Sequence, residues 1–123
     1  MDSYLTNKTE LDRYKKDQEI IRKTALQISK DFAQFGYEII IPKNVHFVYS
    51  SLFDQLAPIV QDMLNENISR LYTVLYCIDL NEKTIQKGIS EMNNLPVYDA
   101  ITHLILEREL KKVITREYFS TNQ

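Results

Sequence analysis

The sequence predicts an all-α protein, a small helical bundle of three long helices and one short helix, with an extended crossover or short hairpin near residues 38–49. Apolar residues recur three and four positions apart through most of the chain, which is the period of amphipathic helices. The 123 residues include only two glycines and three prolines, fewer than the turns of a β-sandwich or barrel require. A chain of this length forms one core, so we expect a single domain over 1–123 with frayed termini at 1–9 and 120–123.

The first long helix is predicted from about Glu10 to Phe35. Its apolar stripe alternates steps of three and four, a heptad pattern typical of coiled-coil-like packing on a partner helix, and consists of Leu11, Tyr14, Gln18, Ile21, Ala25, Ile28, Phe32 and Phe35. Thr9 followed by Asp12 could cap its start, because a hydroxyl can accept from an unpaired backbone amide and a carboxylate favours the positive end of the helix. Gly36 is expected to end it.

Residues 38–49 read EIIIPKNVHFVY and change in character. β-Branched and aromatic residues flank Pro42, Lys43 and Asn44, a combination typical of a turn between extended segments. Two interpretations remain open. Ile39–Ile41 could pair with Val45–Val48 as a hairpin, or the segment could be an apolar crossover that closes one end of the bundle.

Ser51–Leu80 is predicted to be one long central helix. One side of its helical wheel carries an apolar arc, made of Phe53, Leu56, Val60, Met63, Leu64, Asn67, Leu71, Val74, Leu75 and Ile78. Ser51 is its expected N-cap. Pro58 predicts a kink near Asp54–Ala57 or a separate short helix before it. Asn67 lies within the arc, either buried, where it would fix helix register, or near the end of the bundle and in contact with water.

A short helix should follow the sequence Asp79-Leu80-Asn81-Glu82, which resembles a capping box that begins at Asp79. Its apolar residues are Ile85, Ile89 and Met92. Gly88 should weaken this helix by about 1 kcal/mol relative to alanine. Pro96 is well placed to open the last helix, predicted from Val97 to about Phe119.

The last helix has two apolar faces. Its first half directs Val97, Ile101, Leu104 and Ile105 one way, whereas its second half directs Leu106, Leu110, Val113, Ile114 and Tyr118 nearly opposite. Such a helix is either enclosed within the bundle or packs one half on another subunit. The candidate interface residues are therefore Leu110, Val113, Ile114 and Tyr118, together with Ile39 and Phe47 of the crossover.

Asp99, His103 and Glu107 are spaced four residues apart on the last helix. This column could share a metal ion or a proton. The competing interpretation, which we favour, is that Asp99 interacts with the helix dipole and that His103 and Glu107 pair in solvent. Cys77 could act with a histidine, but its apolar neighbours favour a buried, inert side chain. No catalytic or cofactor-binding motif is present, and we expect no cofactor.

Composition narrows the function classes further. The net charge of −2 comes from well-mixed acidic and basic residues, so nucleic-acid binding ranks last. One cysteine and no apolar run of about 20 residues indicate a cytoplasmic protein without a membrane span. We expect a non-enzymatic protein–protein interaction or self-assembly module, a homodimer or a binder of another protein, because tyrosine is abundant at interfaces. The alternative is a metal- or small-ligand-binding bundle that uses Asp99, His103 and Glu107.

Overall fold

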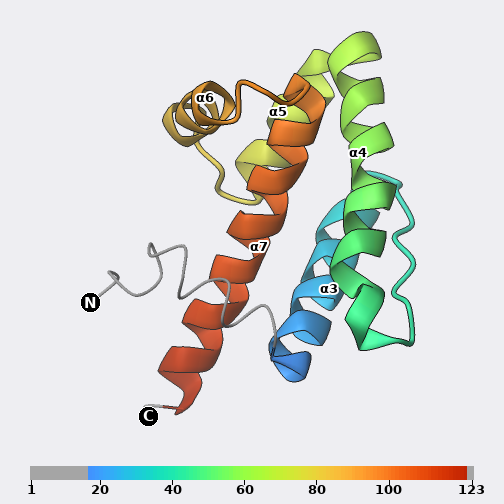
Figure 1. Cartoon of the computed structure of the whole chain (residues 1–123), viewed down its shortest axis with the longest axis vertical. Coiled ribbons are helices and arrows are strands. Elements are labelled where there is room, and N and C mark those ends of the chain that lie inside the picture. Colours follow the sequence, from blue (N-terminus) through green and yellow to red (C-terminus); the bar gives the residue numbers. More distant parts are fainter. Residues whose placement is uncertain (1–16, 122–123) are drawn as a thin grey trace.

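The computed structural model describes residues 17–121 and is all-helical over that range (Figure 1). Its elements are α3 (Gln18–Ala33), the 3₁₀ turn η1 (Val45–Phe47), α4 (Val48–Glu66), α5 (Ile68–Cys77), α6 (Glu82–Glu91) and α7 (Val97–Thr121). The predicted fold class, a small helical bundle, is therefore confirmed. Within the described range, no helix combines the length and the apolar character that crossing a membrane requires.

Helix α7 lies at the centre of the arrangement and contacts α3, α4 and α6. Figure 1 shows it running the length of the molecule, with α6 on one flank and α3 and α4 on the other. Both of its predicted apolar faces are buried except at their ends, where Val97 and Tyr118 are 46% and 40% exposed. The residues with at most 7% of their surface exposed include Ile101, Leu104, Ile105, Leu106, Leu110, Val113 and Ile114. Of the two explanations for a two-faced helix, enclosure within the bundle is the one observed.

The core divides into two clusters along α7. The larger cluster joins the first half of α7 to the inner faces of α3, α4 and α5, and its fully enclosed members include Ile28, Phe32, Leu52, Leu56 and Ile105. The smaller cluster joins Ile20 of α3 to Leu110, Val113 and Ile114 of α7. The two clusters together explain why one helix needs apolar residues on opposite sides.

The ends of α3 follow from local capping chemistry. The Asp17 carboxylate accepts hydrogen bonds from the backbone amides of Glu19 and Ile20 at 3.0 and 3.3 Å, which caps the helix. The predicted start near Glu10, the cap at Thr9 and Asp12 and the frayed residues 1–9 lie outside the described residues. At the other end Gly36 has φ +86°, and Tyr37 N–H donates to Phe32 O at 3.1 Å. This is a Schellman motif, so the predicted stop at Gly36 is confirmed.

The segment between α3 and α4 is an extended crossover, and the predicted hairpin alternative is wrong. Instead of a second strand, the side-chain amide of Gln55 pairs with the backbone of Ile40, accepting from its N–H at 2.8 Å and donating to its carbonyl at 2.7 Å. Val48 is only 1% exposed and begins α4, so the apolar period of that helix outweighs the β propensity of the preceding residues. Ser51 therefore lies inside α4 and is not its N-cap.

The predicted central helix is two helices, and its break falls at Asn67. This residue has φ −157° and ψ 73°, is exposed, and accepts a hydrogen bond from Arg70 N–H at 3.1 Å as the N-cap of α5. An asparagine side chain competes well for such backbone donors, which favours it at caps over helix interiors. Pro58 does not begin a new helix: it is exposed, and α4 continues through it.

The start of α6 also differs from the prediction. Asp79 has φ 62°, and Leu80 N–H donates to Leu75 O at 2.9 Å, so Asp79 ends α5 in a second Schellman motif. The N-cap of α6 is Asn81, whose side chain accepts from Thr84 N–H at 2.9 Å. The last helix begins after Pro96 as predicted and extends to Thr121, two residues beyond the predicted Phe119.

Gly88 is a packing residue of α6. A Cβ atom at this position would lie 2.6 Å from Cδ2 and 2.7 Å from Cδ1 of Leu104, which is buried in α7.

We expect Gly88→Ala to lower the free energy of unfolding by about 1 kcal/mol, because an overpacking cost of ~1–3 kcal/mol exceeds a helix-propensity gain of ~1 kcal/mol. Urea denaturation measures the change. Ser90→Ala, at an exposed site of the same helix, is the control and should be neutral or stabilising; a Gly88→Ala protein more stable than the parent would contradict the contact.

A buried ionisable cluster joins α3 to α7. Lys112 Nζ lies 2.9 Å from Asp31 Oδ2 and 2.8 Å from Glu109 Oε1, and Glu109 is fully buried. Burial and a hydrogen bond with Asp31 raise the pKa of Glu109 to about 8. Burial opposes ionisation of Asp31, but its hydrogen bonds with Glu109 and Lys112 outweigh this and lower its pKa. The proton of the pair therefore resides on Glu109, while Asp31 is the charged partner of Lys112.

The raised pKa of Glu109 makes stability depend on pH. Its ordinary value is 4.5 and its value in the folded chain is about 8, so the folded state binds the extra proton. The stabilisation is complete below about pH 4.5 and is lost as pH rises to about 8, by at most about 1.4 kcal/mol per pH unit. Glu109→Gln cannot ionise, so we expect the parent to lose stability relative to this variant between about pH 5 and 8. Urea denaturation across that range measures the difference in unfolding free energy between the parent and Glu109→Gln, and Glu91→Gln, at an exposed site, is the control. A difference that does not change with pH would contradict the assignment.

Candidate functional site

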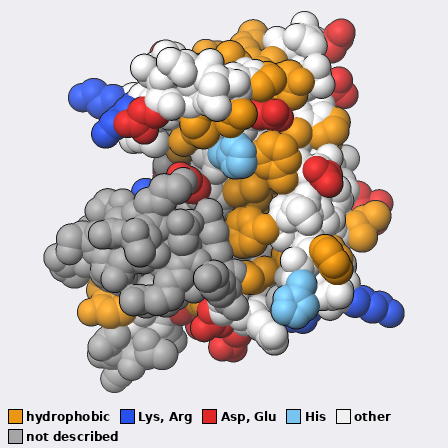
Figure 2. Space-filling view, in the orientation of Figure 1, with side chains coloured by type: hydrophobic (Ala, Val, Ile, Leu, Met, Phe, Trp, Pro, Cys, Tyr) orange, Lys and Arg blue, Asp and Glu red, His pale blue; other side chains and the backbone are white. Residues whose placement is uncertain are grey.

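A pocket of about 590 Å³ opens between α4 and α7. Four of its residues come from α4, two from the end of α6 and the following loop, and three from α7. They are Tyr49, Ser50, Phe53, Asp54, Met92, Leu95, His103, Leu106 and Glu107. Figure 2 shows hydrophobic side chains gathered along this face, with a histidine and acidic side chains among them. Its size lies within the range usual for small-molecule sites.

The apolar wall of the pocket is aromatic on the α4 side. The rings of Phe53 and His103 lie 4.6 Å apart between centroids, inclined at 41°, so the imidazole is held against a hydrophobic surface although it is exposed. Burial, and then the charge of Glu107, raise the pKa of the Tyr49 phenol above its ordinary value. The phenol therefore stays neutral at physiological pH and retains its hydrogen-bonding proton.

The predicted column on α7 is only partly assembled into this site. His103 and Glu107 line the pocket, whereas Asp99 does not and lies half-buried in the first turn of α7. No cluster of three or more His, Cys, Asp or Glu side chains that could hold a metal ion occurs between residues 17 and 121. The spacing correctly placed two side chains on one face, but it did not indicate that two aromatic residues of α4, Tyr49 and Phe53, would line the same pocket.

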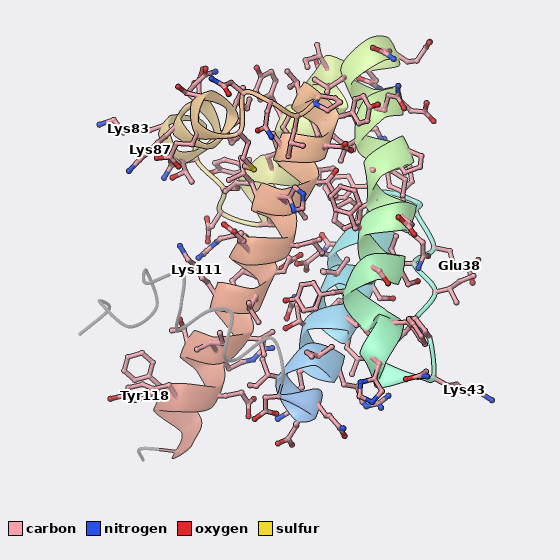
Figure 3. The ribbon with its side chains drawn as sticks, viewed as in Figure 1. Glu38, Lys43, Lys83, Lys87, Lys111 and Tyr118 are labelled. Carbon is pink, nitrogen blue, oxygen red and sulfur yellow. The ribbon has the colours of Figure 1, made fainter. Side chains whose placement is uncertain are left out.

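Four of the six candidate interface residues are not surface residues. Ile39, Leu110, Val113 and Ile114 are each at most 5% exposed within the chain. The other two are accessible, with Phe47 61% and Tyr118 40% exposed. Figure 3 shows Tyr118 near the C-terminal end of α7, pointing away from the bundle. Its ring lies edge-on to that of Phe119, with 5.3 Å between the ring centroids.

A more continuous apolar surface lies on α5. Ile68, Tyr72 and Tyr76, hereafter the α5 face, are 44%, 53% and 81% exposed and are spaced four residues apart, which places them in one row along the helix. The opposite side of α5 is buried through Leu71, Val74 and Leu75. This row was not predicted from the sequence, although the spacing of its three residues is a detectable signal.

Cys77 lies at the end of α5 and is exposed, so the prediction of a buried cysteine is wrong. Helix α5 buries Val74 and Leu75 and then Ile78, and the helical period places Cys77 on the outer side with Tyr76. Its apolar neighbours in the sequence are therefore divided between the two sides of the helix.

The fold and these surfaces define a class, a small all-α bundle with a ligand-sized pocket between α4 and α7 and an exposed aromatic row on α5. Comparison of the chain with models of protein families, with curated proteins and with solved structures gives no match. Function must therefore be argued from the surfaces themselves.

The geometry of the α7 column predicts its response to metal. We expect a molar excess of zinc to leave the melting temperature nearly unchanged, because Asp99 does not join His103 and Glu107 at the pocket and binding that is confined to the folded state is what raises stability. Differential scanning calorimetry of the parent and of His103→Ala provides the measurement. A zinc-dependent increase that disappears in His103→Ala would contradict this placement and restore the metal-binding alternative.

Proposed function

We propose that the protein is a non-enzymatic interaction module that assembles as a homodimer through the α5 face. The observation that carries this proposal is an exposed row of one isoleucine and two tyrosines on α5. Isolated exposed apolar residues are common on protein surfaces, but contiguous ones mark contact sites. Tyrosine suits such sites because it combines a large contact area with a polar tip.

The only charged residue of α5 is engaged elsewhere. Arg70 Nε donates to the Tyr37 hydroxyl at 3.3 Å, its guanidinium also donates to Phe35 O, and it lies 5.5 Å from the centroid of the Tyr37 ring. This arginine therefore fastens α5 to the end of α3 rather than giving charge to the α5 face. Apart from Arg70, the residues between the members of the row are uncharged: Ser69, Leu71, Thr73, Val74 and Leu75.

A second copy of the chain is the partner that suits this surface. In a two-fold interface the same patch lies on both subunits, so each charge near the axis would meet its own copy. An uncharged row avoids that repulsion. The nearest acidic residues along the chain, Glu66 and Asp79, are both exposed and fall beyond the two ends of α5, where solvent can screen them. A cytoplasmic location is part of the same proposal, because an exposed free thiol such as Cys77 persists best in a reducing compartment.

Tyr76→Lys tests the proposal. Tyr76 is 81% exposed, so the substitution should not disturb folding, but it would place two ammonium groups in a two-fold interface. We expect light scattering at tens of micromolar to give a dimer mass for the parent and a monomer mass for the variant. Both proteins should carry Cys77→Ser, so that a disulfide is not mistaken for the interface.

The matched control is Leu26→Lys, at a 55% exposed leucine of α3, and this variant should remain dimeric. A parent protein that is monomeric under these conditions would refute self-assembly. A dimer that survives Tyr76→Lys but not Phe47→Lys would locate the interface at the crossover instead.

A second candidate function is the binding of a small ligand in the pocket between α4 and α7. Its volume and its mainly apolar lining with a few polar groups favour this function. His103 and Glu107, both members of the α7 column, would contact the ligand, and Asp99 would not.

A further inference from the structure

We infer that the pocket between α4 and α7 selects a small organic cation with an apolar, preferably aromatic, body. This inference rests on the second candidate function and adds the chemical class of the ligand. It follows from two properties of the pocket, the shape and character of its walls and the sign of the charges among its lining residues.

The walls suit an apolar body. Phe53 contributes a ring from α4, Leu106 contributes a buried side chain from α7, and Met92 and Leu95 close the end next to α6. Methionine and leucine side chains adapt to planar ligands at little cost. The imidazole of His103, already held against Phe53 at 4.6 Å, extends the flat surface on which a ring can stack.

The charged groups suit a cation. The fixed charges of the lining are the carboxylates of Asp54 on α4 and Glu107 on α7, on opposite sides of the opening, and none of the described lining residues is lysine or arginine. The neighbouring Arg108 is directed elsewhere, since its Nε donates to Ile78 O at 2.9 Å. Figure 3 shows Lys83 and Lys87 of α6 and Lys111 of α7 pointing outward, on the side of the bundle that lies away from α4.

The aromatic groups of the pocket add to this preference. The neutral phenol of Tyr49 brings no positive charge; burial is the main cause of its raised pKa, and the negative charge of Glu107 adds to it. The faces of the Phe53 and Tyr49 rings can also attract an ammonium group through cation–π interaction. An anionic ligand would be repelled by the two carboxylates that line the pocket.

Three indole derivatives that differ in one terminal group test the inference: tryptamine, a cation, tryptophol, which is neutral, and indole-3-propionate, an anion. The protein contains no tryptophan, so the emission and anisotropy of the indole report binding directly. At low salt we expect tryptamine to bind about 5- to 10-fold more tightly than tryptophol, and indole-3-propionate more weakly than either. The advantage of tryptamine should shrink as salt is raised.

Variants localise the effect. Asp54→Asn and Glu107→Gln should each reduce the affinity for tryptamine about 2- to 5-fold while leaving that for tryptophol unchanged. Asp62→Asn, at an exposed site on the same helix as Asp54, removes one charge from the same chain and should change neither affinity.

The outcomes separate the two claims. Equal affinity for all three compounds would leave ligand binding standing and overturn the selection of cations. Absence of binding by every compound up to millimolar concentration would overturn both claims. Preference for tryptamine that responds equally to Asp54→Asn and Asp62→Asn would show a general effect of net charge and would also overturn the inference.

Discussion

The structure depends on the burial of α7 on both sides. This helix carries apolar residues on nearly opposite faces, and the first half packs into the main core whereas Leu110, Val113 and Ile114 pack with Ile20 of α3. Neither face could be left exposed without a large apolar patch in contact with water. The other helices are therefore arranged around α7, and the buried Glu109, Asp31 and Lys112 cluster joins it to α3.

This arrangement determines which surfaces remain for function. Most apolar side chains of α7 are buried in the interior, so most of the exposed large apolar side chains of the described residues lie on other elements, Tyr72 and Tyr76 of α5 among them. Helix α5 packs mainly on α4 and presents Tyr72 and Tyr76 outward, whereas the upper part of α7 and α4 enclose the pocket. Self-assembly and ligand binding would thus occupy separate regions of one small bundle.

The features that could be predicted from the sequence are those encoded locally. Gly36 and Pro96 mark helix boundaries by their own backbone chemistry, and the helical period identified both faces of α7. Asp79 could not be predicted in the same way, because its positive φ is imposed by Leu80 packing into the core. The apolar periodicity of Ser51–Leu80 is continuous across Asn67. The break between α4 and α5 depends on the side-chain cap that Asn67 provides, which the spacing of apolar residues does not indicate. Likewise, the four-residue spacing of His103 and Glu107 predicted that they share one side of the last helix. That Phe53 and Tyr49 line the same pocket depends on how α4 packs on α7, which the spacing does not indicate.

Hydroxyl-radical footprinting of side chains over a range of protein concentrations would establish whether both faces of α7 are covered within a single chain. If they are, Leu110 and Ile114 will be unreactive at every concentration, while Tyr72 and Tyr76 will react in dilute solution and become protected as the concentration rises. Reactivity of Leu110 and Ile114 that appears on dilution would show instead that another copy of the chain, and not its own helices, covers the second face of α7.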